Sequence, residues 1–190
     1  MQFIPTAIPE VIIIEPKVFG DERGYFVETF RQDKLDEFLG FKIDFIQDNE
    51  SKSSYGVLRG LHYQLAPAAQ TKLVRVIKGK VLDVAVDIRV GSPTFGRHVS
   101  VELSEQNKRQ MLVPRGFAHG FVVLEDDSIF AYKVDNYYSP EHDRGLAFDD
   151  AVLSIDWQVS AEHLKLSVKD TQQPSLDQAE LFDYGRSLYV

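Results

Sequence analysis

Short stretches in which apolar and polar residues alternate dominate this chain, and they limit the folds that it can adopt. In the run 81–88 (VLDVAVDI) the even-numbered apolar residues fall on one face, and Asp83 and Asp87 fall on the other. This period of two is typical of β-strands, in which successive side chains point to opposite faces. Further short apolar strands are predicted at 72–78, 97–103, 111–113, 120–124 and 129–134.

Turn residues separate these segments. Lys-Gly-Lys at 78–80 predicts a hairpin turn, and the segments 91–93 and 125–127 predict loops. Many short strands punctuated in this way favour a sandwich or barrel, and we expect an all-β antiparallel jelly roll. One amphipathic helix is predicted at 32–39, with Asp33 near its start and Gly40 as its stop. The few other short helices are expected in the tail from residue 160, packed across the barrel mouth.

The length and composition fit a single domain spanning residues 1–190. The chain has no Cys, which excludes disulfides, thiolate metal sites and a Cys nucleophile. No apolar run approaches the roughly 18 residues needed to cross a bilayer. The first ten residues show no secretory signal. We therefore expect a cytoplasmic protein that does not associate with membranes.

The formal net charge of −8 argues against a nucleic-acid partner, because proteins of that class carry a basic surface. The same charge constrains the binding of an anionic ligand. The cations that hold such a ligand must be local, since the field of the whole protein repels it.

Two histidine-containing segments are candidates for a site. The string PRGFAHG at 114–120 resembles the second sequence motif of the cupin superfamily, in which a turn directs a His, here His119, into a barrel. In the partner segment 56–64, metal-binding cupins carry His-x-His followed by a carboxylate, whereas this chain has His62 and then Gln64. Two histidines are fewer than the three ligands of a typical catalytic metal site, so no metal is expected. A His without a metal can still act as a base, because imidazole titrates near neutral pH.

Strand parity raises a difficulty in the segment 56–64. Arg59 and His62 are three positions apart, so a regular strand would direct them to opposite faces. Gly60, which lies between them, could allow a bulge that brings both inward. Without such a bulge, one of the two is a surface residue.

Taken together, the motifs resemble those of the dTDP-4-dehydrorhamnose 3,5-epimerase family over about residues 12–183. The markers are DERGYFVE (21–28), QDNES (47–51), GVLRGLHYQ (56–64), KLV (72–74), PRGFAHGF (114–121), Tyr132, YYSPE (137–141) and SVKD (167–170). The resemblance implies a cupin-type jelly roll, a homodimer, and a dTDP-4-keto-6-deoxy-hexose substrate. It also implies inversion at C3 and C5 without a cofactor. Both carbons lie beside the C4 ketone, so loss of either proton gives an enolate that the carbonyl stabilises.

The resemblance also implies roles for individual residues. His62 matches the base, Asp170 the carboxylate that orients it, Tyr132 the acid on the opposite face, and Lys72 the cation at the C4 oxygen. The residues implied to line the pocket or to contact the sugar, the nucleotide or the diphosphate are Arg23, Phe26, Glu28, Gln47, Asn49, Arg59, His119, Tyr138, Asp143 and Lys169. Asp143 stands where many members carry Glu, so its shorter side chain is a departure from the pattern.

Three other functions fit a chain of this kind. A monofunctional epimerase of the same fold would invert only C3 or only C5 of a dTDP-4-keto-6-deoxy sugar. A 3,4-ketoisomerase would move the keto group instead of inverting carbons. A sugar-binding cupin without catalytic activity would bind dTDP ligands and exchange no protons with solvent.

Overall fold

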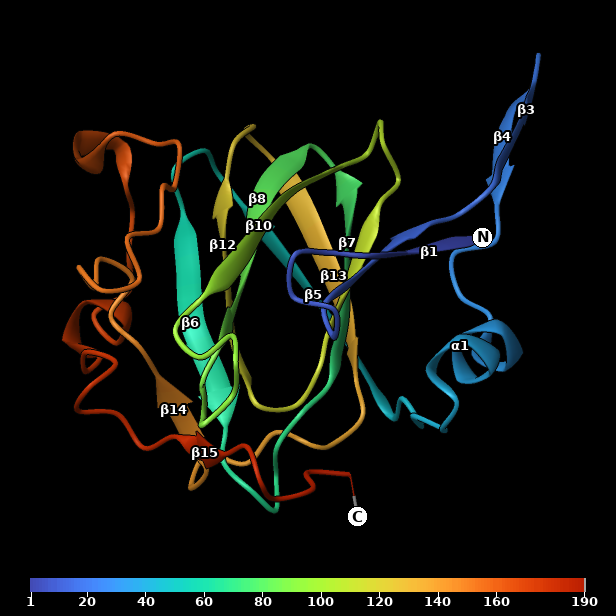
Figure 1. Cartoon of the computed structure of the whole chain (residues 1–190). Helices are drawn as coiled ribbons and strands as arrows, with labels where there is room; N and C mark the ends of the chain where they lie inside the picture. Colours follow the sequence, from blue (N-terminus) through green and yellow to red (C-terminus); the bar gives the residue numbers. More distant parts are fainter. Residues whose placement is uncertain (190) are drawn as a thin grey trace.

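Two antiparallel sheets face each other in this computed structural model, which describes residues 1–189 (Figure 1). The larger sheet has the strand order β1 (Gln2–Pro5), β2 (Ile12–Glu15), β11 (Gln110–Val113), β7 (Lys72–Lys78), β13 (Ser128–Val134) and β5 (Gln47–Ser53). The smaller sheet has the order β10 (His98–Ser104), β8 (Lys80–Asp87), β12 (Phe117–Val123), β6 (Leu58–Gln64) and β14 (Asp143–Gly145). The predicted all-β antiparallel architecture is confirmed.

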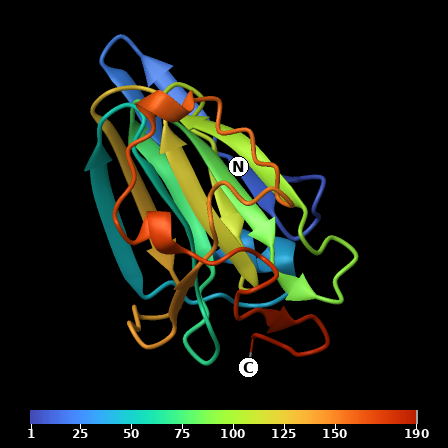
Figure 2. The ribbon, with the colours of Figure 1, turned by 90° about the vertical axis from the view of Figure 1, so that its left-hand side faces the viewer.

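Strand β8 shows how the alternating sequence is used. Val81 and Ala85 pack between the two sheets. Leu82 and Val84 point to the opposite face, which is also buried. That second face is covered because the C-terminal part of the chain lies over it, as Figure 2 shows. Both sides of the smaller sheet are therefore hydrophobic interfaces, and burial of apolar area on both of them stabilises the fold.

The C-terminal tail, defined here as residues 146–189, packs along the outer face of the smaller sheet. Its anchors on that sheet are Trp157, Leu176 and Phe182. Its regular elements are the short 3-10 helices η1 (Ala161–His163) and η2 (Asp170–Gln172) and the strand β15 (Phe182–Asp183), which pairs with β9 (Arg89–Val90). The expected position across the barrel mouth is wrong for most of the segment 160–189, since only its residues 165–167 and 170 border the cavity between the sheets. The tail is also less helical than expected, because its irregularly spaced anchors form no helical stripe.

Helix α1 (Gln32–Leu39) coincides with the predicted helix. Gly40 ends it in the left-handed conformation, with φ 76° and ψ 4°, which glycine adopts without steric cost. Leu35 is buried and packs on the outer face of the larger sheet, against Ile14 and Leu73. Within residues 1–189, no helix is long and apolar enough to cross a membrane.

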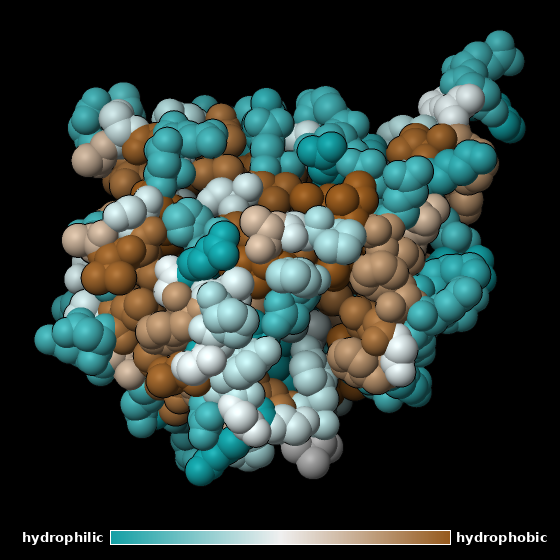
Figure 3. All heavy atoms as spheres, viewed as in Figure 1, coloured by the Kyte–Doolittle hydropathy of each residue, from teal (hydrophilic) through white to brown (hydrophobic). Residues whose placement is uncertain are grey.

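A two-stranded hairpin of β3 (Val18–Asp21) and β4 (Gly24–Val27) projects from the body of the molecule (Figure 1). It exposes aromatic surface, since Phe19 and Phe26 are 51% and 66% accessible. Figure 3 shows a hydrophilic tip on this hairpin, with hydrophobic atoms behind it. The hairpin therefore presents apolar area to solvent in the isolated chain.

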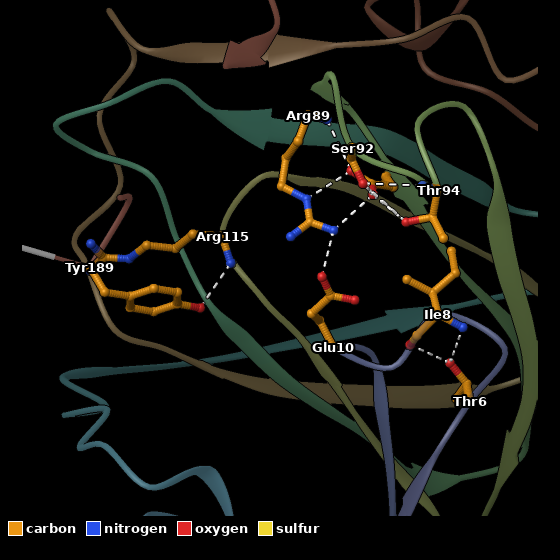
Figure 4. A network of polar contacts seen from close by, with 9 residues as sticks. Thr6, Ile8, Glu10, Arg89, Ser92, Thr94, Arg115 and Tyr189 are labelled. Atoms are coloured by element: carbon orange, nitrogen blue, oxygen red, sulfur yellow. Dashed lines mark hydrogen bonds and ion pairs between the residues drawn. The ribbon is translucent and has the colours of Figure 1, made fainter. Parts of the chain in front are cut away.

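A polar network around Asp87 connects three segments of the chain, and Figure 4 labels its members Glu10, Arg89, Ser92 and Thr94. The fully buried carboxylate accepts hydrogen bonds from Ser92 Oγ at 2.5 Å, Thr94 Oγ1 at 2.6 Å and Arg89 Nη2 at 2.8 Å. Arg89 also pairs with Glu10 of the N-terminal loop at 3.0 Å. These bonds compensate for the desolvation of the charges, and they attach the loop to the end of β8.

Candidate active site

A cavity of about 570 Å³ lies between the two sheets and is bordered by residues 165–167 and 170 of the tail. The side chains that line it come from both sheets, with β6 and β12 on one side and β5, β7 and β13 on the other. Its cations are Arg59, Lys72 and Lys165. These local positive charges can hold an anionic ligand despite the negative charge of the whole chain.

His62 and Asp170 form a hydrogen-bonded pair in this cavity. His62 Nε2 lies 2.5 Å from Asp170 Oδ1, and Asp170 is only 4% exposed. Burial raises the pKa of Asp170, but the hydrogen bonds from His62 and Ser167 outweigh it, so that its pKa lies below the usual value. The ionised carboxylate can only accept, so Nε2 carries a proton, and in the neutral imidazole the lone pair is on Nδ1.

Lys72 enters the cavity from β7, and its Nζ lies 3.4 Å from the backbone oxygen of His62. Burial of the ammonium group lowers the pKa of Lys72 to about 8, although Asp83 and Asp143 oppose that effect. The group remains mostly protonated at neutral pH, and its positive charge is available to a developing oxyanion.

Tyr132 faces the cavity from β13 in the larger sheet, opposite the sheet that carries His62. Burial raises the pKa of Tyr132, although the charge of Arg59 acts in the other direction. The phenol therefore keeps its proton at neutral pH. A phenol on one sheet and an imidazole on the other enclose one space, an arrangement suited to proton transfer on two faces of a bound molecule.

The parity difficulty at Arg59 and His62 is resolved by a bulge in β6. His62 pairs with His119 and Arg59 pairs with Phe121, so that two residues of β6 stand opposite Gly120 alone. The extra residue reverses the face of the sheet to which the side chains after the bulge point. Both Arg59 and His62 consequently line the cavity.

His119 also lines the cavity, and beneath it lies a carboxylate that the sequence analysis did not select. His119 Nε2 is 3.0 Å from each oxygen of the fully buried Asp83. Burial lowers the pKa of His119, although Asp83 opposes that effect. The signal for Asp83 was present in the sequence, as an acid on a strand face shared with Val81 and Ala85. Ser53, which lies 3.2 Å from the Arg59 guanidinium, and Ser167 were missed as well.

The remaining predicted residues fall into two groups. Near the cavity, Asn49 lines the wall and accepts a hydrogen bond from Gln47 at 2.8 Å. Asp143 accepts a hydrogen bond from Tyr138 at 3.1 Å and forms an ion pair with Lys169, the neighbour of Asp170. The shorter side chain of Asp143 is thus engaged within the protein.

Arg23, Phe26 and Glu28 form the second group, and none of them lines this cavity in its own chain. Arg23 and Phe26 lie on the projecting hairpin, where the Arg23 guanidinium pairs with Asp21. Glu28 follows β4 and lies 3.6 Å from Arg31. One chain alone therefore does not bring these three residues to His62.

Gln64, at the position where metal-binding cupins carry a ligand, is used differently here. Its amide donates to the backbone oxygens of Ala68 at 2.6 Å and Tyr137 at 3.2 Å, and it accepts from Ser139 N at 2.7 Å. Across the described residues 1–189, no three or more His, Asp or Glu side chains gather in a way that could hold a metal ion.

The fold and the cavity define a class of protein, a jelly-roll barrel whose cavity is lined by a His and a Tyr from opposite sheets. The family model described as dTDP-4-dehydrorhamnose 3,5-epimerase matches residues 5–178. An enzyme of that name from Shigella flexneri is 54% identical over 182 residues, which cover 96% of this chain and 99% of that one. The chain therefore belongs to the dTDP-4-dehydrorhamnose 3,5-epimerase family.

Solved structures agree with this assignment. The dTDP-6-deoxy-D-glucose-3,5-epimerase of Legionella pneumophila, in complex with dTDP-4-keto-L-rhamnose, has a TM-score of 0.93 and 49% identity and covers 97% of this chain and 99% of its own. A 3'-monoepimerase from Streptomyces bikiniensis, in complex with dTDP-quinovose, has a TM-score of 0.90 and 33% identity and covers 95% of this chain and 92% of its own. The family and the cupin-type fold expected from the sequence are confirmed.

Proposed function

We propose that this chain inverts C3 and C5 of dTDP-4-dehydro-6-deoxy-D-glucose and so forms dTDP-4-dehydro-L-rhamnose. One observation carries the proposal: His62 and Tyr132 line the same cavity from opposite sheets. Inversion beside a ketone needs a base on one face of the sugar and an acid on the other. No cofactor takes part in this reaction.

In the first step, His62 Nδ1 takes the proton from C3, and the electron pair of the broken C–H bond moves toward the C4 oxygen. Lys72 stabilises the resulting enolate through its positive charge. Asp170 holds the Nε2 proton and stabilises the imidazolium that forms. Tyr132 then donates its phenolic proton to the opposite face of C3 and regains a proton from solvent. The same sequence at C5, where proton donation by Tyr132 has its clearest role, completes the double inversion.

We propose that Arg59, His119, Asn49 and Gln47 contact the sugar and the first phosphate. Lys169, Tyr138 and Asp143 then bind the remainder of the nucleotide. The ion pair between Lys169 and Asp143 supports this assignment, because it holds a further cation next to Asp170, beside a cavity that already contains Arg59, Lys72 and Lys165. Charge-assisted hydrogen bonds of this kind contribute about 1.5–3 kcal/mol each.

A homodimer accounts for Arg23, Phe26 and Glu28. The hairpin exposes aromatic surface and lies apart from the cavity of its own chain, so we propose that it reaches the cavity of a second copy. Burial of Phe19 and Phe26 would contribute to the stability of the dimer. We further propose a cytoplasmic location for the enzyme.

The decisive experiment is incubation of the protein with the 4-keto sugar in heavy water, followed by proton NMR of C3 and C5. Double inversion predicts solvent deuterium at both carbons and an L-configured product. Exchange at one carbon alone would indicate a monofunctional epimerase. A shifted keto group would indicate a ketoisomerase, and binding without exchange would indicate a sugar-binding protein. Any of these three results contradicts the proposal.

The matched control is His62→Asn, in which an amide of similar size replaces the base. We expect this variant to bind dTDP and to lose exchange at both carbons by about 10²–10⁴-fold. Near-normal turnover in His62→Asn would remove His62 from the role of base. A fluorescence or calorimetric titration with dTDP separates loss of catalysis from loss of folding.

A further inference from the structure

Ser167 borders the cavity and makes two hydrogen bonds with one residue, Asp170. Its Oγ lies 2.7 Å from Asp170 Oδ2 and 3.1 Å from Asp170 N. The directions of both bonds are fixed by chemistry. An ionised carboxylate cannot donate and a backbone N–H cannot accept, so the hydroxyl donates to Oδ2 and accepts from the N–H.

These contacts divide the Asp170 carboxylate between two partners. Oδ1 lies 2.5 Å from His62 Nε2, and Oδ2 lies 2.7 Å from Ser167 Oγ. With both oxygens engaged, the carboxylate cannot rotate about its Cβ–Cγ bond without breaking a charge-assisted hydrogen bond. The orientation of the His62 ring, and the choice of ring nitrogen that carries the proton, therefore depend on a hydroxyl whose hydrogen bonds go to Asp170.

We propose that Ser167 is a positioning residue for the base, acting through Asp170 to keep the Nδ1 lone pair of His62 directed at the reacting carbon. This inference rests on the proposed function, in which His62 removes the proton. It assigns Ser167 no contact with substrate. It predicts that the hydroxyl affects the rate of proton removal and leaves nucleotide affinity unchanged.

A purely structural role for the hydroxyl has less support from the local backbone. The turn that contains Asp170 also has main-chain hydrogen bonds, from Asp170 N and Thr171 N to Ser167 O, at 3.1 and 3.3 Å. These bonds do not involve Oγ and persist when Oγ is removed. Loss of the hydroxyl therefore releases the carboxylate while most of the turn stays in place.

The variant Ser167→Ala tests the proposal, with Ser175→Ala as the matched control. Ser175 lies in the same tail and donates from its Oγ to Asp177 Oδ1 at 2.5 Å, but it does not line the cavity. We expect Ser167→Ala to lower kcat for deuterium exchange by about 10–100-fold, the range expected when a catalytic group is misplaced. The dissociation constant for dTDP should stay within about twofold of the wild-type value, because ground-state binding is untouched. Ser175→Ala should match the wild type in both.

Two further substitutions separate positioning from structure. Ser167→Thr keeps the hydroxyl and should restore most of kcat. Ser167→Cys keeps the size of the side chain but donates only a weak hydrogen bond, so its kcat should lie between those of Ser167→Ala and the wild type. Ser167→Cys also serves if Ser167→Ala fails to fold. In an Asp170→Ala background, Ser167→Ala should change kcat by less than about twofold, because no carboxylate remains to be positioned.

The outcomes are distinct. Two results would overturn the positioning role: a wild-type kcat in folded Ser167→Ala, or an equal loss of kcat from Ser167→Ala in the presence and absence of Asp170. The proposed function would stay intact in both cases, because the wild-type protein would still exchange protons at both carbons. Absence of exchange in the wild type and in Ser175→Ala would overturn both. A kcat defect confined to the Ser167 variants and dependent on Asp170 supports the proposal.

Discussion

Replacing Gly60 with alanine tests the close approach of β6 to β12 at the bulge. Gly60 has φ 124°, a conformation that strains any residue with a Cβ. An added Cβ would lie 2.5 Å from Gly120 Cα and 2.8 Å from His119 O, and these backbone atoms cannot rotate away. Backbone strain costs about 1–3 kcal/mol and overpacking about 1–3 kcal/mol more, so we expect a total loss of about 2–6 kcal/mol.

The assay for Gly60→Ala is a melting curve measured together with solvent exchange at C3. Because 1 kcal/mol shifts Tm by about 2–4 °C in a chain of this size, the variant should melt about 4–24 °C below the wild type. Exchange should fall as well, since Arg59 and His62 flank the strained position. Gly185→Ala is the control, because its Cβ would meet only the end of the exposed Asp183 side chain, at 3.3 Å. A Tm within about 2 °C of the wild type, with normal exchange, would refute this account of the bulge.

Three further predictions concern single side chains. The Tyr132→Phe variant should still exchange deuterium into C3 through His62 but should form little L-configured product. The measurement is the ratio of C3 to C5 exchange by proton NMR; an unchanged ratio in a destabilised variant would show that the phenol is only structural. Arg23→Ala should raise KM more than it lowers kcat, because diphosphate binding is remote from the reacting carbons; a pure turnover defect would contradict its assignment. Asp87→Asn should cost about 3 kcal/mol at pH 7, by leaving Arg89 without its buried charge partner. Burial raises the pKa of Asp87, but the hydrogen bonds from Arg89, Ser92 and Thr94 outweigh it and hold the pKa below its usual value. The contribution of Asp87 to folding stability is therefore present above about pH 4 and is lost as the pH falls through the pKa in the folded state. The melting difference between wild type and Asp87→Asn should therefore shrink in acid, and a constant difference would argue against this linkage.

The sequence predicted the barrel well because its signals are local. Alternation identified β7 with the bounds 72–78 and located β8, and Gly40 marked the end of α1. The motifs also selected the residues of both sheets that meet in the cavity, including His62 and Tyr132. The alternation and turn signals depend on neighbours within a few positions, whereas the site residues were implied by the resemblance of motifs spread over residues 12–183.

The tail and the support of the site were harder to predict. Alternation in β8 separates two faces, but it cannot say that a segment more than sixty positions later covers the outer one. Asp83 therefore looked like the polar side of a half-exposed strand, although it is completely buried beneath His119. The bulge at Gly60 was left open for the same reason, since its outcome depends on contact with Gly120 on another strand.

The pair of His62 and Asp170 joins positions 108 residues apart, one on the barrel and one on the tail that covers it. The proposed base therefore has its carboxylate partner only while the tail is docked. A segment that packs on a sheet without being one of its strands can open by sub-global fluctuation while the sheet beneath it stays paired. Such an opening would remove Asp170 and Ser167 together and leave the barrel hydrogen bonds intact. In a denaturant series, catalytic activity would then report the free energy of docking the tail, and it would disappear before the β-sheet signal does.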